Sequence, residues 1–329
     1  MQNRIYNTKA IIEAGLISAL IVIIMLLNVY MPIFSVFGTF ILPVPITMLY
    51  IRHNYKVTLS AVVVSGILIG MLYDPISALT ASILFGSTGI ALGYCIKHDI
   101  KFSKTILYLA IASVLAIIVK FVLIFSFVYT EGIIQFFNQN IKLLNESFNV
   151  SKDLYIKMGI PNDQIANLEK MTSMFTVDYV LRLIPATIII ISFISAYLNY
   201  VITRAILKKL RYTIKEPKPF TEIYINTRIG TIVVLILIVG ILLNKNKIEI
   251  GEYITSSSGF VLQIIFLLDG LAVACYYLKN KFKMSKMVIV LILVFTATSP
   301  ISIIYMYLGF IDMIIDFRKL DPYRRLIKE

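Results

Sequence analysis

The chain has 329 residues, of which 59% are hydrophobic and only 15% are charged. Soluble domains carry about 25% charged residues, and apolar runs of about 20 residues, the length that crosses a bilayer, recur along this sequence. The composition therefore excludes a soluble globular domain and predicts an all-α polytopic integral membrane protein. The net charge of +13 does not indicate a nucleic-acid partner, because the basic residues stand between the apolar runs.

We expect about ten transmembrane helices, eight of full length followed by a short C-terminal hairpin. The expected spans are residues 10–30, 38–51, 57–72, 76–96, 105–129, 176–203, 226–243, 256–278, 286–298 and 301–317. The hairpin turns within "FTATSPIS" (295–302), where Pro300 begins the returning helix. One bent element in place of the last two spans is the alternative.

The distribution of basic residues predicts that both termini lie in the cytoplasm. With the N-terminus inside, 23 of the 31 Lys and Arg residues fall in cytoplasmic segments and six in outer segments. Loops rich in Lys and Arg stay on the cytoplasmic side of a membrane. The expected location is the bacterial cytoplasmic membrane, crossed several times, with the lipid bilayer as the first partner.

The long basic loop divides the chain into three expected parts. Residues 1–203 form a six-helix membrane domain, with an extracytoplasmic helical insertion at 131–175. Residues 204–225 form a basic cytoplasmic linker, and residues 226–329 form a four-helix membrane part with a basic cytoplasmic tail. Apolar residues recur at helical spacing in the insertion, which predicts helices there.

Pro43 and Pro45 interrupt the second expected span within "LPVPITMLY" (42–50). Each proline lacks an N–H and disturbs the helical hydrogen bonds. Broken helices at membrane depth line cavities or face protein, and in transporters they often mark the binding site. A kink that serves packing alone is the alternative.

Lys120 stands among nine apolar neighbours in "AIIVKFVLIF" (116–125). It lies about 14 Å from the outer end of its helix at 1.5 Å per residue, and an unpaired charge there costs at least about 3 kcal/mol. We predict that it pairs, directly or through water, with Asp269, the acid at matching depth, and so ties the N-terminal six helices to the last four. Asp74 and Asp178, nearer the rim, are the second choices of partner. Gln263 lies about two turns nearer the outside and is a further candidate for ligand binding. A pair that only fastens helices and a pair that binds solute or protons both remain open.

Two other pairs of charged residues lie one helical turn apart. Asp178 and Arg182 are expected at the outer membrane edge, where they pair with each other or Arg182 meets an anionic group of a ligand. Asp312 and Asp316 are expected to pair with the basic residues that follow them. Asp312 lies deeper, so we expect it to make an interhelical contact.

The first span carries a stripe of small residues, Ala10, Ala14 and Ser18, at four-residue spacing. Small residues let helices approach closely. The stripe predicts packing against a helix of the same chain or, as the alternative, a docking face for another membrane protein.

The sequence indicates no enzyme, cofactor or metal site. Cys95 and Cys275 do not have the spacing of metal ligands. No HExxH motif, no Ser/His/Asp spacing and no metal-binding carboxylate pattern occurs. No phosphate-binding G-x-x-x-x-G-K-[ST] motif occurs either, so ATP-driven work would need partner proteins.

Five stretches carry a resemblance along nearly the whole chain: "EAGLISAL", "LPVPITMLYIRH", "GSTGIALGYCIKH", "VDYVLRLIPATIII" and "YLGFIDMIIDFRK". In their order and spacing they resemble the YybS-like family of predicted bacterial membrane proteins. The resemblance implies a multi-pass membrane protein.

Residues 8–203 are more remotely similar to the S components of energy-coupling-factor vitamin transporters. That similarity implies six membrane helices, an outward-opening pocket for a small-molecule solute and an alanine stripe that faces a transmembrane coupling subunit. The stripe here is Ala10 and Ala14, continued by Ser18. The interpretation is a solute-binding or transport protein; a membrane scaffold or regulatory partner is the alternative.

The predicted orientation is tested by single cysteines in a chain whose two native cysteines are replaced. In intact cells, a membrane-impermeant thiol reagent should label a cysteine at position 157 and spare one at position 208. Outside labelling at position 208 contradicts the orientation.

Overall fold

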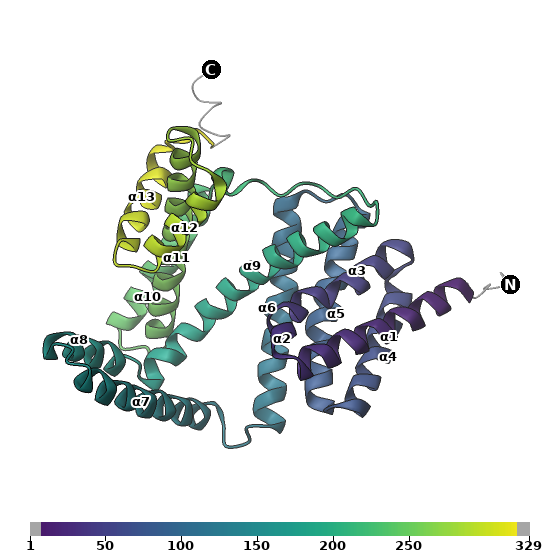
Figure 1. Ribbon diagram of the computed structural model, residues 1–329, viewed down its shortest axis with the longest axis horizontal. Helices are drawn as coiled ribbons and strands as arrows, with labels where there is room; N and C mark the ends of the chain where they lie inside the picture. The colour runs from purple at the N-terminus through teal and green to yellow at the C-terminus, as the bar shows by residue number, and fades with distance from the viewer. Residues whose placement is uncertain (1–7, 321–329) are drawn as a thin grey trace. The chain divides into compact units, whose positions relative to one another are not determined.

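The computed structural model describes residues 8–320, apart from the side chains of residues 32, 33, 35–37, 162, 167 and 171. Every regular element in that range is a helix (Figure 1), which confirms the all-α prediction. The elements are, in chain order, α1 (Thr8–Tyr30), α2 (Pro32–Ile41), α3 (Pro43–Arg52), α4 (Tyr55–Leu72), α5 (Pro75–Lys97), α6 (Phe102–Phe127), α7 (Ile133–Lys157), α8 (Asn162–Ser173), α9 (Val177–Lys209), the 3-10 turn η1 (Phe220–Glu222), α10 (Thr227–Lys245), α11 (Ile250–Asn280), α12 (Lys286–Ala297) and α13 (Ser302–Ile315).

Seven helices of the described range are long and apolar enough to cross a membrane: α1, α4, α5, α6, α9, α10 and α11. Helices α12 and α13 pass the same test only together, and they bend by 106° at their junction. Length and composition thus give seven or eight spans between residues 8 and 320, against about ten expected. The sequence analysis counted α12 and α13 separately and counted residues 38–51, where the apolar helical stretch Gly38–Arg52 falls short of spanning length.

The junction of α2 and α3 lies at the two prolines. Leu42 keeps helical backbone angles (φ −53°, ψ −39°), and Pro43 takes the first position of α3. A proline costs little there, because the first N–H groups of a helix have no partner within it. Pro43 and Pro45 are both buried, so this short helix is held by packing inside the protein.

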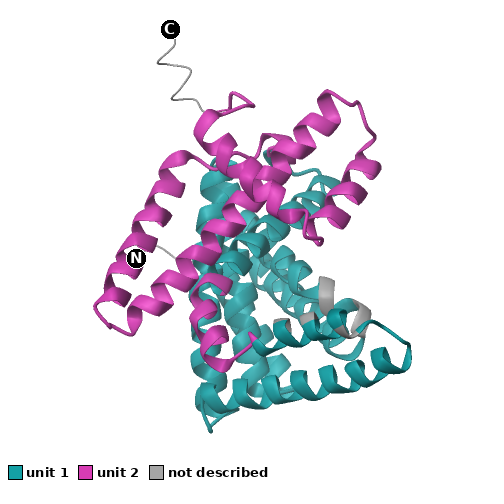
Figure 2. Ribbon diagram, turned by 90° about the vertical axis from the view of Figure 1, so that its left-hand side faces the viewer, with its two compact units in different colours: residues 1–173, 188–217 teal, residues 174–187, 218–329 magenta. Residues whose placement is uncertain are grey.

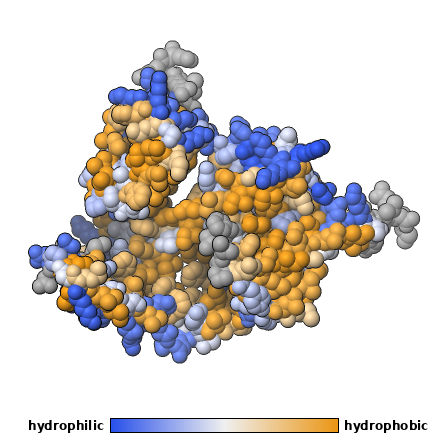
Figure 3. Space-filling model, viewed as in Figure 1, coloured by the Kyte–Doolittle hydropathy of each residue, from blue (hydrophilic) through white to orange (hydrophobic). Residues whose placement is uncertain are grey.

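The spanning helices expose long apolar side chains. Leu16, Met71 and Leu115 are 67%, 80% and 60% exposed, and Figure 3 shows hydrophobic residues over wide parts of the visible face. Exposure to water costs about 25 cal/mol per Å² of apolar surface. A lipid bilayer removes that cost, so these faces contact lipid.

The chain divides into two compact units (Figure 2). Unit 1 comprises Met1–Ser173 and Ile188–Pro217, and unit 2 comprises Met174–Thr187 and Lys218–Glu329. Helix α9 therefore contributes its first turns to unit 2 and the rest to unit 1. The sequence analysis instead assigned the whole of residues 176–203 to the N-terminal part.

One hydrophobic cluster of unit 1 lies among α1, α3, α4 and α5, and a second joins α5, α6 and α9. Ile21, Ile46, Leu49 and Ile69 are the fully buried members of the first. Helix α3 is further tied to α5 by Thr47, whose hydroxyl donates to the carbonyl oxygen of Gly89 at 3.1 Å.

The small-residue stripe of α1 packs inside unit 1. Ala10 and Ser18 are buried, and the Ser18 hydroxyl donates to the carbonyl oxygens of Ala14 at 2.8 Å and of Ala61, in α4, at 3.1 Å. Ala14 is partly buried against the same core. Ala10 and Ser18 therefore do not form an open docking face for another membrane protein.

Helices α7 and α8 occupy the segment 131–175, where the apolar spacing predicted helices. None of the residues of α7 is buried. The Lys152 ammonium pairs with the Glu169 carboxylate of α8, and this hydrogen-bonded partner raises the pKa of Lys152.

In unit 2, α11 and α13 cross with their backbones in contact. A Cβ atom added to Gly270 would lie 1.8 Å from the carbonyl oxygen of Tyr305, and one added to Gly309 would lie 1.9 Å from that of Phe266. Only glycine fits at either position, because the obstructing atoms belong to the backbone and have no rotamer to change. Small residues allow this kind of approach between membrane helices.

Replacing Gly270 or Gly309 by Ala should lower the stability of unit 2. We expect losses at the upper end of the about 1–3 kcal/mol that overpacking costs, or beyond it, read as a lower midpoint of thermal unfolding in detergent. Gly259→Ala is the matched control on α11, because the nearest atom to its added Cβ is a Leu237 methyl at 4.0 Å. Equal midpoints for all three variants would contradict the close crossing.

Candidate functional site

Lys120 lies on the stripe of α6 that packs into the core of unit 1. Going along the helix, Leu109, Ser113 and Ala116 are buried, and steps of three and four residues lead from them to Lys120 on the same face. Lys120 itself is exposed. The packed stripe therefore opens into a hollow at Lys120.

The hollow is a cavity of about 420 Å³ among α1, α2, α5 and α6. Its polar lining consists of Asn28, Thr39, Ser77, Thr80, Lys120 and Tyr129. The remaining lining is apolar and includes Met25, Leu84 and Phe85. Among the described residues of this lining, Lys120 carries the one charge.

Asn28 brings an unused hydrogen-bonding group to the cavity lining. Its side-chain oxygen is buried and has no partner. A Cβ added to Gly38 of α2 would lie 2.6 Å from that oxygen. Because Gly38 has no side chain, the Asn28 amide fits in this position. An unsatisfied buried polar atom costs about 1–3 kcal/mol.

The N-terminus of α5, which contributes Ser77 and Thr80, is capped within the chain. The Asp74 carboxylate accepts from the backbone N–H of Ser77 at 2.6 Å, and this hydrogen bond lowers the pKa of Asp74. The carboxylate of Asp74 is therefore held at the end of α5 and is not part of the cavity lining. Lys120 is the charged group of that lining.

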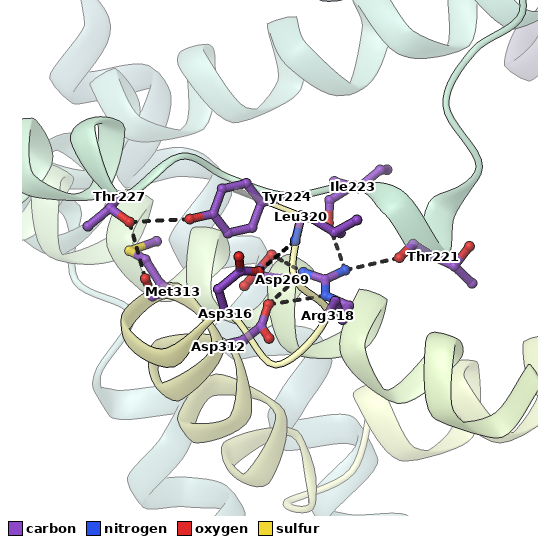
Figure 4. Close-up of polar contacts among 10 residues, drawn as sticks. All are labelled: Thr221, Ile223, Tyr224, Thr227, Asp269, Asp312, Met313, Asp316, Arg318 and Leu320. Carbon is purple, nitrogen blue, oxygen red and sulfur yellow. Dashed lines mark hydrogen bonds and ion pairs between the residues drawn. The ribbon is translucent and has the colours of Figure 1, made fainter. Parts of the chain in front are cut away.

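A second polar place lies in unit 2, where Arg318 joins two buried aspartates (Figure 4). Its Nη2 donates to Asp269 Oδ1 at 2.7 Å and to Asp312 Oδ2 at 2.9 Å, and its Nε donates to Asp312 Oδ2 at 3.1 Å. Its Nη1 donates to the carbonyl oxygens of Thr221 at 3.2 Å and Ile223 at 2.8 Å. All three charged side chains are 0% exposed.

A left-handed turn after α13 brings Arg318 to this position. Asp316 has φ +54° and its backbone N–H donates to the carbonyl oxygen of Asp312 at 2.7 Å. Asp316 Oδ1 then accepts from the backbone N–H of Leu320 at 2.8 Å. The chain folds back on the end of α13, so Arg318 reaches Asp312 six residues earlier.

The structure gives Asp269 an ion partner other than the predicted Lys120. Asp269 takes Arg318 as its ion partner within unit 2, whereas Lys120 belongs to unit 1 and lines the cavity. The sequence predicts that Arg318 pairs with the nearby aspartates, and its contact with Asp312 confirms this, but the contact of Arg318 with Asp269 was not predicted. The sequence did contain a signal that Asp269 and Asp312 face each other. Small residues mark the faces where helices meet, and Gly270 lies beside Asp269 while Gly309 lies one turn before Asp312.

Arg182 also has a different partner from the one expected on its own helix. Its guanidinium pairs with the Glu252 carboxylate of α11, and its carbonyl oxygen accepts from the Ser257 hydroxyl at 2.6 Å. Asp178 and Gln263 are exposed. The described cavity lining includes Lys120 but not Arg182, Asp178 or Gln263.

The remaining candidates lie elsewhere in the described structure. Pro43 and Pro45 are buried at the start of α3 beside Leu42, which does line the cavity. Asp312 makes the expected interhelical contact, through Arg318 to Asp269 of α11.

Comparison with known proteins finds matches over most of the chain. A family profile described as "Predicted membrane protein (DUF2232)" matches residues 19–313. The chain is also 25% identical to "Uncharacterized protein YybS" of Bacillus subtilis (strain 168) over 316 residues, which are 93% of this chain and 96% of that protein. No solved structure matches. These matches confirm the resemblance to the YybS-like family.

Asp312→Asn should lower the thermal stability of the protein, whereas Asp316→Asn should lower it much less. Asp312 accepts two hydrogen bonds from a buried guanidinium, and weakening such charged bonds costs about 1–3 kcal/mol. Asparagine at position 316 keeps the left-handed turn and an oxygen for Leu320. The measurement is the midpoint of thermal unfolding of each variant. A larger loss of stability in Asp316→Asn than in Asp312→Asn would contradict the cluster.

Proposed function

The chain belongs to the family of predicted membrane proteins described by DUF2232, and we propose that it is a solute-binding protein of the bacterial cytoplasmic membrane. The proposed ligand is a small organic anion with an apolar body, held in the cavity of unit 1. The role assigned is binding, as part of transport, and not catalysis.

This proposal is based mainly on the position of Lys120 in the cavity lining. A lysine inside a membrane helix is costly and is retained where it meets a counter-charge or a water-filled cavity. Lys120 faces a cavity, and no carboxylate stands in the cavity's described lining. A bound anion supplies the missing counter-charge.

The rest of the cavity suits the same ligand class. Its volume of about 420 Å³ falls within the roughly 300–1,000 Å³ of small-molecule sites. Apolar side chains with a few polar groups are the usual lining of such sites. The Asn28 amide and the Thr39 and Thr80 hydroxyls can orient the ligand, while Phe85 and Leu84 contact its apolar body.

The similarity of residues 8–203 to S components supports transport as the wider role. Because the sequence has no phosphate-binding motif for ATP, we propose that a separate membrane subunit couples binding to translocation. That partner would use a surface other than Ala10 and Ser18, which are buried in unit 1. The scaffold alternative relied on this stripe and on the basic inner loops, and it loses the support of the stripe.

The proposal is tested by purifying the wild type, Lys120→Met and Lys104→Met. Methionine keeps the length of lysine and removes its charge, and Lys104 is an exposed lysine of α6 outside the cavity lining. Mass spectrometry of extracted small molecules should find an organic anion with the wild type and with Lys104→Met. Lys120→Met should carry roughly tenfold less, because a charged hydrogen bond contributes about 1.5–3 kcal/mol.

A thermal-shift measurement tests the ligand class directly. Phenylacetate, which has one carboxylate and an apolar ring, should raise the unfolding midpoint of the wild type and of Lys104→Met. Uncharged 2-phenylethanol should raise it less. A phenylacetate response that is unchanged in Lys120→Met, together with no difference in extracted anions, would contradict the proposal.

A further inference from the structure

The cluster of Asp269, Asp312 and Arg318 holds more acid than base. Two carboxylates share one guanidinium, and all three side chains are 0% exposed. With both acids ionised, the cluster keeps one unbalanced negative charge away from water. An uncompensated buried charge costs several kcal/mol.

No second cation balances that charge among the described residues packed around the cluster. Arg318 is the one buried cation between residues 8 and 320. On the neighbouring elements, Glu222, Arg228 and Lys319 are exposed. The other titratable groups shown in Figure 4 are Tyr224, whose hydroxyl pairs with Thr227 at 3.3 Å, and Asp316, which adds no positive charge.

Each aspartate also presents one unused oxygen. Asp269 Oδ2 and Asp312 Oδ1 are buried and have no hydrogen-bond partner. A carboxylate oxygen out of water without a donor pays its full desolvation cost. The cluster therefore lacks one positive charge, and neither unused oxygen has a hydrogen-bond donor.

We propose that this cluster is a proton-binding site that takes up one proton from water. One carboxylate becomes a carboxylic acid, and the net charge of the three side chains becomes zero. The proton resides on Asp269, because Arg318 donates two hydrogen bonds to Asp312 and one to Asp269. Asp312 is therefore the better stabilised anion.

This site goes beyond the solute cavity and does not depend on it. It lies wholly within unit 2, and its residues are not among those that line the cavity. Loss of solute binding in Lys120→Met would leave the proton site unaffected, and the reverse also holds.

The first test follows thermal unfolding of the full-length protein by far-ultraviolet circular dichroism from mildly acidic to alkaline pH. The wild-type midpoint should fall as pH rises, because release of the proton leaves an unpaired buried charge in the folded state. Asp269→Asn, which mimics the neutral acid, should keep the acidic midpoint and lose this fall. Asp178→Asn, an exposed acid of the same unit, should retain the wild-type pH dependence.

The second test does not rely on a stable variant. Infrared difference spectra of the wild type between acidic and alkaline pH should show the carbonyl stretch of a buried carboxylic acid. Asp269→Asn should remove that band, and Asp178→Asn should not.

Three results would overturn the proposal. The first is a wild type without such a band, and the second is an Asp269→Asn variant with the full pH dependence. The third is a midpoint that responds to exchanging sodium for choline at constant ionic strength as strongly as it does to pH, which would assign the site to a metal cation instead.

Discussion

A charge inside an apolar helix bundle must meet an opposite charge or water, and both polar places of this chain follow from that constraint. In unit 2, Arg318 is fully buried and is satisfied by two carboxylates and two backbone carbonyls. In unit 1, Lys120 is accommodated differently, because its stripe of α6 opens into a cavity that water or an anion can enter. Arg318 lies at the centre of a packed polar cluster, and Lys120 lines a cavity.

The burial of the cluster depends on the close crossing of α11 and α13. Gly270 and Gly309 bring the two backbones into contact, and Asp269 and Asp312 are their near neighbours in sequence. Water is excluded at such a crossing, so each acid must be paired or neutralised within the protein. Arg318 supplies one positive charge for two acids, and the remaining imbalance is the basis of the proposed proton site.

The cavity depends on a different arrangement of helices. Helix α2 is short and adjoins α3 at Leu42, and Gly38 leaves room for Asn28. Polar groups from α1, α2 and α5 thus line the same hollow as Lys120. A cavity with a single cation and an apolar wall is suited to an amphipathic anion more than to a cation or a fully polar solute.

The sequence alone located the helices closely, because local properties set them. Apolar length predicted 57–72 and 76–96, and the structure has Tyr55–Leu72 and Pro75–Lys97. Their starts are fixed by Asn54 and Asp74, which accept from backbone N–H groups three residues later. The sequence also identified Lys120 as a charge that requires an explanation.

The tertiary structure alone decided which charge meets Asp269. Depth along a helix pointed from Lys120 to Asp269, but depth does not specify which way a side chain faces or which helix lies opposite. The partner of Asp269 is Arg318, which is brought back by a left-handed turn at Asp316 that no apolar pattern signals. The cavity was likewise beyond the sequence, because a hollow is the space that several helices leave unfilled, and it is encoded by no single segment of the chain.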